Sequence, residues 1–176
     1  MNLYRTFLGD RLDTLPPQVQ AFHDPDGVTV WQGTAEVQRG ANPVAKLVCH
    51  LFGFPATGEA VRLRLTITPL EDGELWDRDF GGRRLVSKQV TRNGWLIEHL
   101  GPIRIQMRPV IDGDRFSVAP EKWSLFSIML PSTLMPSSEN FETEDMGRFQ
   151  FNVAISAPLI GPLVSYRGHL EKRDVS

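Results

Sequence analysis

Apolar and polar residues alternate along most of this chain. In 61–68, valine, leucine and isoleucine occupy every second position, with arginine or threonine between them. The same two-residue period recurs in 103–108 and 149–156. It is typical of strands with one buried and one exposed face, because successive side chains of a strand point to opposite sides. Further strands are expected within 28–37, 73–80, 84–90, 95–100, 116–123 and 164–170.

Short turn signals separate these strands. They are Asp72-Gly73, Gly81-Gly82, Asn93-Gly94, Asp112-Gly113 and Gly161-Pro162. Asn-Gly in particular favours a tight hairpin, so consecutive strands are expected to be antiparallel neighbours.

The pattern predicts about eight to ten strands, a number at which a sheet curls or closes on itself. We therefore predict a mainly β fold: an antiparallel, strongly curved sheet or calycin-like barrel, formed by a single domain over 1–176. A helix-grip fold is the alternative. Such folds usually finish with a long helix, whereas this chain ends on a predicted strand.

Helices are expected in two places. The first two dozen residues predict two short helical pieces, one with Leu3, Phe7 and Leu8 on one stripe and one that begins at Pro16-Pro17. A sharper helix is predicted near 43–52, with Asn42 as its N-cap. The positions of this helix expected to face the core are Val44, Leu47, Val48 and Leu51.

The segment 125–136 interrupts the alternation. It is apolar, contains two prolines and two methionines, and carries no charged residue. One interpretation is a loop that covers one end of the barrel as a plug, because methionine commonly fills irregular gaps. The other is a lid or a partner surface, because exposed apolar patches commonly mark binding sites.

Composition excludes several classes of protein. Hydrophobic residues make up 41% and charged residues 23% of the chain, as in ordinary soluble proteins. A net charge of −2 argues against a nucleic-acid partner. No window approaches the roughly 18 consecutive apolar residues of a spanning helix, so no membrane span is expected. The lone Cys49 cannot form an internal disulfide, and the first residues lack the features of a signal peptide; a cytoplasmic location is expected.

Candidate chemistry is concentrated in 73–84. On a strand, Glu74, Trp76, Arg78 and Phe80 share one face. If that face points inward, Glu74 and Arg78 either form a buried ion pair or jointly hold the polar group of a ligand. The opposite register would bury Leu75 with two aspartates and is less favourable.

Familiar catalytic and cofactor motifs are missing. The four histidines are scattered, and the sequence contains no HExxH, CxxC, GxSxG, GxxxxGK or GxGxxG pattern. We expect no metal and no cofactor, and the sequence identifies no catalytic residue. Whether the protein is an enzyme stays open, because an acid-base enzyme needs none of these motifs.

Several linked motifs resemble a known family. They are Gly73-Glu74-x-Trp76-x-Arg78-x-Phe80-Gly81-Gly82, Glu98-x-x-Gly101-Pro102, Leu130-Pro131-x-x-Leu134-x-Pro136, and a final one that runs from Pro158 to Leu170. The chain is similar to the bacterial family called domain of unknown function 4166, although that family usually has tryptophan where this chain has His169. The resemblance implies a bacterial protein, joined in some other chains to a nicotinamide-dependent dehydrogenase-like domain. It implies no activity and no catalytic residues.

Three hypotheses for function follow. The first is noncatalytic binding of a small, partly apolar ligand inside the barrel, with Trp76, Phe80 and Trp123 as contact surface and Glu74 with Arg78 fixing a polar group. The second is an acid-base enzyme that uses Glu74 and Arg78 in the barrel cavity. The third is an accessory module that docks on a dehydrogenase-like partner through 126–135.

Overall fold

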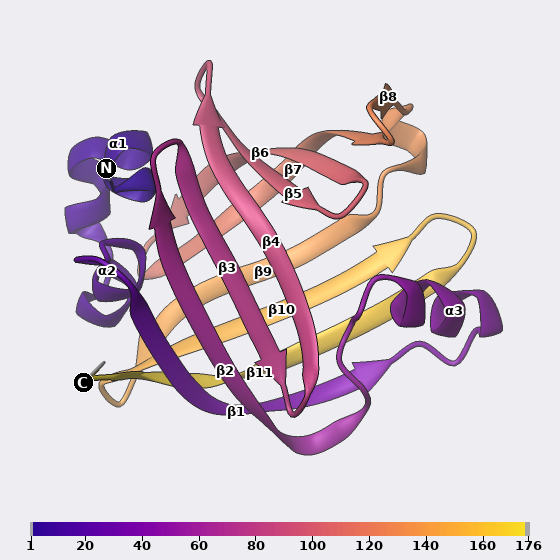
Figure 1. The fold of residues 1–176 in the computed structure, drawn as a ribbon, viewed down its shortest axis with the longest axis horizontal. Helices are drawn as coiled ribbons and strands as arrows, with labels where there is room; N and C mark the ends of the chain where they lie inside the picture. The colour runs from indigo at the N-terminus through magenta and orange to yellow at the C-terminus, as the bar shows by residue number, and fades with distance from the viewer. Residues whose placement is uncertain (1, 175–176) are drawn as a thin grey trace.

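In the part of the chain that the structure describes, ten strands follow one another round a closed barrel, and three short helices and two 3-10 helices accompany them (Figure 1). The computed structural model describes residues 2–174. The N-terminal elements are α1 (Leu3–Leu8), η1 (Gly9–Thr14), α2 (Pro17–His23), β1 (Thr29–Arg39) and α3 (Pro43–Leu51). The others are β2 (Gly58–Leu70), β3 (Gly73–Phe80), β4 (Arg83–Arg92), β5 (Trp95–Leu100), β6 (Ile103–Asp112), β7 (Arg115–Leu125), β8 (Ile128–Met129), η2 (Ser132–Leu134), β9 (Ser137–Asp145), β10 (Arg148–Ala157) and β11 (Gly161–Arg173).

Every strand pair in the described chain is antiparallel. Strands β1 to β7 pair in order, then β7 with β9, β9 with β10, β10 with β11, and β11 with β1, which closes the barrel. The two-residue strand β8 adds to β7 outside the ring. The predicted mainly β fold with an antiparallel, barrel-like sheet is therefore confirmed.

The β1–β11 and β7–β9 pairs differ in how far their strands are hydrogen-bonded. Strands β1 and β11 pair along their length, from Val30 opposite Arg173 to Arg39 opposite Val164. Strands β7 and β9 share one ladder pair, Phe116 with Glu142. The barrel therefore has one continuous closure and one seam.

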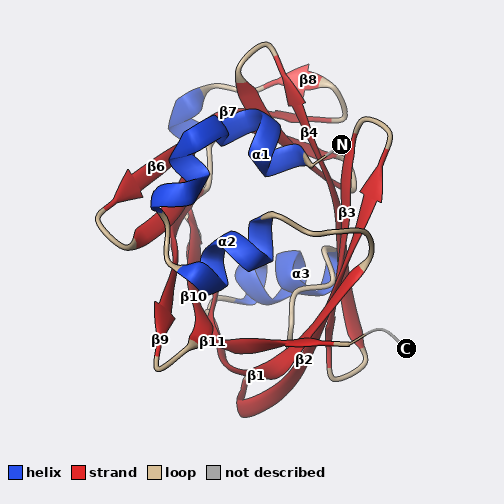
Figure 2. Ribbon diagram, turned by 90° about the vertical axis from the view of Figure 1, so that its left-hand side faces the viewer, coloured by secondary structure: helices blue, strands red, loops and turns tan. Residues whose placement is uncertain are grey.

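The predicted helical lead-in is confirmed and covers one end of the barrel (Figure 2). Phe22 of α2 is buried and stacks on Phe149 of β10, with 3.9 Å between ring centroids. Trp31 of β1 meets the Phe22 ring edge-on at 5.1 Å. None of the helices in the described part of the chain has both the length and the apolar character needed to cross a membrane.

Helix α3 forms where the sequence predicts it, but the prediction of its core face is wrong. The Asn42 side chain caps it by accepting a hydrogen bond from the Val44 N–H at 2.9 Å. The buried residues are Ala45 and Cys49, whose small side chains let the helix lie close to β11 at the barrel end. Of the predicted core positions, Val48 is partly buried, whereas Val44, Leu47 and Leu51 are exposed.

The segment 125–136 does not act as a buried plug. Phe126, Ile128 and Met129 are exposed, and the opposite end of the barrel is the one that helices α1 and α2 cover. Leu125 at its start and Leu134 to Pro136 at its end line the barrel interior.

Candidate functional site

A cavity of about 400 Å³ lies inside the barrel. Its floor, next to the helical lead-in, includes Tyr4 and Phe116, and its wall is largely apolar. At the α3 end it is lined by residues such as Phe52 and by Leu134, which is also exposed at the surface. The cavity therefore reaches the surface at the end opposite to α1 and α2. We call this opening the mouth.

Strand β3 lies in the inward register that the sequence favours. Glu74, Trp76 and Phe80 are buried, and Arg78 is on the same face. On the other face, Asp77 forms an ion pair with Arg84. The register that would bury the two aspartates is thus excluded.

The residues predicted to bind a ligand divide into two groups. Trp76, Arg78 and Trp123 line the cavity, whereas Glu74 and Phe80 are not among its lining residues. Glu74 is buried and accepts a hydrogen bond from the Trp76 indole Nε1 at 3.0 Å. Phe80 packs edge-on against Tyr166, with 5.4 Å between ring centroids. Trp76 and Phe80 thus share the inner face of β3, but of the two only Trp76 lines the cavity.

The Glu74–Arg78 ion pair, one of the two alternatives for these residues, does not form, because Arg78 pairs with Glu98. Its Nη2 lies 3.6 Å from Glu98 Oε1, and its Nη1 donates to Ser87 Oγ at 2.9 Å. The guanidinium carbon lies 4.9 Å from the centre of the Trp76 ring. Leu96, Glu98 and Leu100 alternate along β5, and this pattern is the signal that could have placed Glu98 on the inner face.

Further polar groups lie at the floor and come from distant parts of the chain. The Tyr4 hydroxyl donates to Gln89 Oε1 at 2.8 Å, and Glu142 is hydrogen-bonded to Nε2 of the buried His23. Burial, reinforced by the charge of Glu142, raises the pKa of Tyr4 well above its ordinary value. Tyr4 therefore stays protonated and remains a donor. No local spacing in the sequence links these residues, so pattern analysis missed them.

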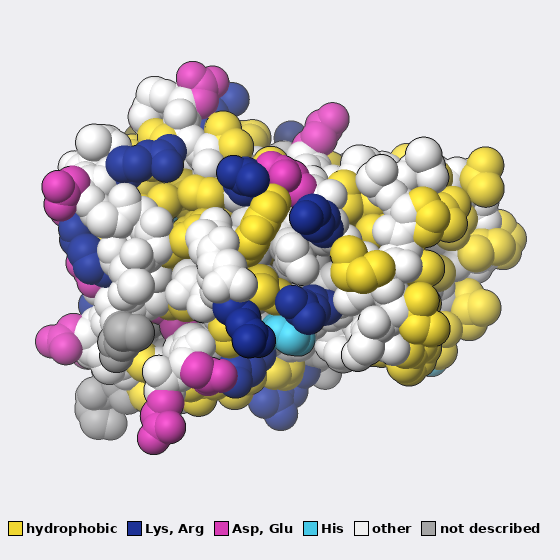
Figure 3. Space-filling view, turned by 90° about the horizontal axis from the view of Figure 1, so that it is seen from above, with side chains coloured by type: hydrophobic (Ala, Val, Ile, Leu, Met, Phe, Trp, Pro, Cys, Tyr) yellow, Lys and Arg dark blue, Asp and Glu magenta, His cyan; other side chains and the backbone are white. Residues whose placement is uncertain are grey.

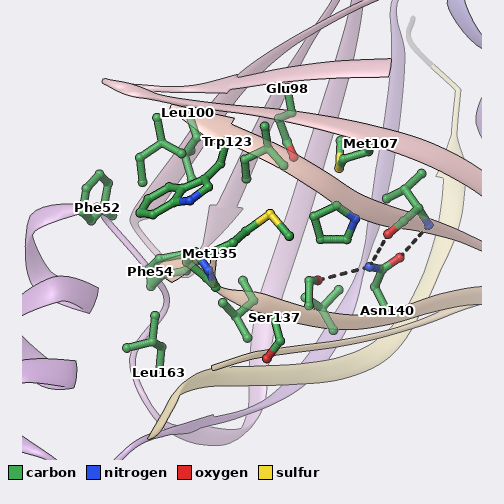
Figure 4. A pocket seen from close by; sticks show the side chains of 18 of the residues that line it. Phe52, Phe54, Glu98, Leu100, Met107, Trp123, Met135, Ser137, Asn140 and Leu163 are labelled. Carbon is green, nitrogen blue, oxygen red and sulfur yellow. Dashed lines mark hydrogen bonds between the residues drawn. The ribbon is translucent and has the colours of Figure 1, made fainter. Parts of the chain in front are cut away.

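Figure 4 shows how the two regions of the cavity differ. Phe52, Phe54, Trp123 and Met135 lie on one side of the view, toward α3, and form an apolar wall. Glu98 and Asn140 are on the other side, with Met107 near them. The Trp123 indole Nε1 donates to the Pro131 carbonyl oxygen at 3.1 Å, which fastens the segment 130–136 beside the mouth. The arrangement offers an apolar outer part and a polar inner part.

Asn140 also holds the β7–β9 seam together. Its amide oxygen accepts from the Val118 N–H and its amide nitrogen donates to the Val118 carbonyl, both at 2.9 Å. The side chain thus takes the place of missing ladder bonds between the strands.

Replacing Asn140 by aspartate is expected to lower the free energy of unfolding by about 2 kcal/mol at pH 7. An ionised carboxylate still accepts from the Val118 N–H but repels the Val118 carbonyl. Urea unfolding measures the loss, and amide exchange at Val118 shows whether the seam is affected. The same change at Asn152, on the outer face of β10, is the control; equal losses in the two variants would argue against the seam role.

The environment of Glu74 also predicts a dependence of stability on pH. Burial raises the pKa of Glu74, while the Trp76 hydrogen bond and the charge of His23 oppose the shift. A raised pKa in the folded state means that stability is full below the ordinary carboxyl value of about 4.3 and falls as pH rises above it. Glu74→Gln removes this loss, so the free energy of unfolding of the variant relative to the parent should increase from pH 4 to pH 7.

Glu36→Gln is the matched control. Hydrogen bonding to Arg167 lowers the pKa of Glu36, so this control should change in the opposite direction over the same pH range. Urea unfolding at each pH compares both variants with the parent protein. If the difference in free energy of unfolding between Glu74→Gln and the parent does not change with pH, the pKa of Glu74 is not raised in the folded state.

Within residues 2–174, no three histidine, cysteine, aspartate or glutamate side chains gather in an arrangement that could hold a metal ion.

Comparisons with known proteins give one match. A search of curated proteins found no match, and neither did a search of solved structures. A family model matches residues 15–170, a range that contains α2, every strand up to β10 and most of β11. All of the predicted site residues lie within it. The chain therefore belongs to the family described as Domain of unknown function (DUF4166).

Proposed function

We propose that this protein binds a small, partly apolar molecule inside its barrel and does not convert it. The observation that carries the proposal is the cavity of about 400 Å³ with its largely apolar wall. Ligand pockets typically measure about 300–1,000 Å³ and combine apolar walls with a few convergent polar groups. An apolar cavity of only about 150 Å³ already suffices to bind benzene.

The polar end of the ligand is assigned to Arg78. A guanidinium has five N–H donors, and in this structure Ser87 and Glu98 engage only part of that capacity. Gln89 and Tyr4 line the same inner part of the cavity. A carboxyl or hydroxyl group placed here would find both donors and acceptors, while Trp76 and Trp123 contact the apolar part.

Geometry favours binding over acid-base chemistry by Glu74. Glu74 does not line the cavity, and its carboxylate accepts from the indole of Trp76, which does. A general acid or base must come within hydrogen-bond reach of the reacting group. We accordingly assign Glu74 the role of orienting Trp76, and Phe80 that of supporting Tyr166.

Native mass spectrometry tests the proposal. The purified protein is measured under native and denaturing conditions, first as isolated and then after incubation with long-chain fatty acids and fatty alcohols. We expect a noncovalent adduct that disappears on unfolding, at one molecule per chain. An adduct-free native spectrum under both conditions would contradict the proposal.

A further inference from the structure

Exposed apolar side chains gather around the mouth of the cavity. We define the apolar rim as Leu47 and Leu51 of α3, Phe126, Ile128 and Met129 next to β7, and Leu159 of the β10–β11 turn. Figure 3 shows hydrophobic side chains concentrated at the right-hand end of the molecule, where α3 and β8 lie in Figure 1. Contiguous apolar patches of this kind mark interaction sites.

The most prominent rim residues are held out by unusual backbone. Leu159 has φ +66° and is 98% exposed, and Phe126 has φ +48° and is 74% exposed. Positive φ is uncommon for side chains of this size, and turns that need it normally use glycine or asparagine. Met146 shares both properties but lies alone in the β9–β10 turn, at the opposite end. The gathering at the mouth is therefore what distinguishes the rim.

The charge pattern of the rim limits what can cover it. The segments 43–55, 124–138 and 157–163 contain no aspartate or glutamate, and Lys46 and His50 are their only basic residues. An electrostatic partner, whether acidic or basic, would find almost nothing to pair with here. The rim instead matches an apolar surface that tolerates one nearby cation.

The apolar surface continues from the rim into the cavity. Leu134 and Met135 follow the exposed Met129 and line the cavity, and Pro158 and Ile160 flank Leu159 and do the same. A ligand that leaves the cavity by the mouth therefore stays in contact with apolar side chains up to the rim.

We propose that the apolar rim docks on the surface of a lipid bilayer, so that an apolar ligand passes between bilayer and cavity without crossing water. This inference rests on the proposed ligand binding. Three separate elements project side chains round an opening, which suits shallow insertion among lipid headgroups better than contact with one protein groove. Because the rim carries so little charge, binding should be to neutral lipid and insensitive to salt.

Vesicle flotation tests the inference. We expect the wild-type protein to float with phosphatidylcholine vesicles, equally at low and high sodium chloride. The variant Phe126→Glu/Leu159→Glu should lose at least about tenfold in partitioning, because both side chains would have to bring a charge into the interface. Both positions are highly exposed, so the variant should fold. Met146→Glu makes the same change in an exposed turn at the other end and should float like the wild type.

The controls separate this inference from the proposed function. Native mass spectra should show that the rim variant still retains a fatty acid, since its cavity is unchanged. If the wild type retains the fatty acid but does not float, the docking proposal is wrong and ligand binding stands. If none of the proteins retains the fatty acid, ligand binding itself is contradicted. The docking proposal is also wrong if the rim variant floats as well as the wild type. It is wrong too if the rim holds a copurifying protein but no vesicles.

Discussion

Replacing Val153 by tryptophan is expected to weaken the proposed ligand binding strongly and leave the barrel folded. Val153 lies in the middle of β10, opposite Asn140 of β9 and Tyr166 of β11, and it lines the cavity. An indole at this position would occupy space that the proposed ligand needs. Because the cavity is large, the ring should fit without the strain that overpacking causes in a filled core.

We expect affinity for dodecanoic acid, the probe ligand, to fall by at least about tenfold. Isothermal titration measures the affinity, and urea unfolding checks that stability is unchanged or slightly increased, as in other cavity-filling variants. Ala154→Trp is the control because the next residue of a strand points to the opposite face. If Val153→Trp binds dodecanoic acid as well as Ala154→Trp does, the ligand site is not in the barrel.

Replacing Gly33 by alanine is expected to cause the largest loss of stability among single methyl additions in β1. A Cβ at Gly33 would lie 1.9 Å from the carbonyl oxygen of His169 on β11. The reverse contact is as tight, since a Cβ at Gly168 would lie 2.0 Å from the Thr34 carbonyl oxygen. Both obstacles are backbone atoms, so β1 and β11 would have to separate.

The expected loss exceeds about 3 kcal/mol, which is a large part of the 5–15 kcal/mol that holds a typical domain folded, as a rough guide. Urea unfolding and the yield of soluble protein measure the effect. Thr34→Ala, at the adjacent outward position, should change the free energy of unfolding by less than about 1 kcal/mol. An unfolding midpoint for Gly33→Ala within error of the Thr34→Ala value would refute the close approach of β1 and β11.

Where the inner face of a strand is apolar, the strand and its inward face could be predicted from the sequence. The alternation in 61–68 and 149–156 and the inward register of β3 follow from burying one face of each strand. Strand β9 was missed because Ser138, Asn140 and Glu142 face the cavity and the seam, so it lacks an apolar period. A polar inner face marks a strand as part of a candidate site. It can be recognised only once the neighbouring strands have been placed.

Pairing across strands and exposure at the barrel end could not be predicted from local patterns. Arg78 of β3 reaches Glu98 of β5 across β4, where it also donates to the Ser87 side chain. The periodicity of α3 indicates which residues share a face, but not that the helix rests on Ala45 and Cys49 while Leu47 and Leu51 point away. Those facts depend on where the helix docks, which its own sequence does not specify.

The pairing of β1 with β11 sets an order of events during synthesis of the protein. Strand β1 is synthesised before its neighbour β11, so one edge of β1 has no native partner until residues up to Arg173 have emerged. Helix α2 likewise lacks its native contacts until β9 and β10 have been made, since Phe22 packs on Phe149 and the Gln18 N–H donates to Glu144. An unpaired strand edge is a template for aggregation. The free edge of β1 is therefore open to pairing with other chains until β11 has been made.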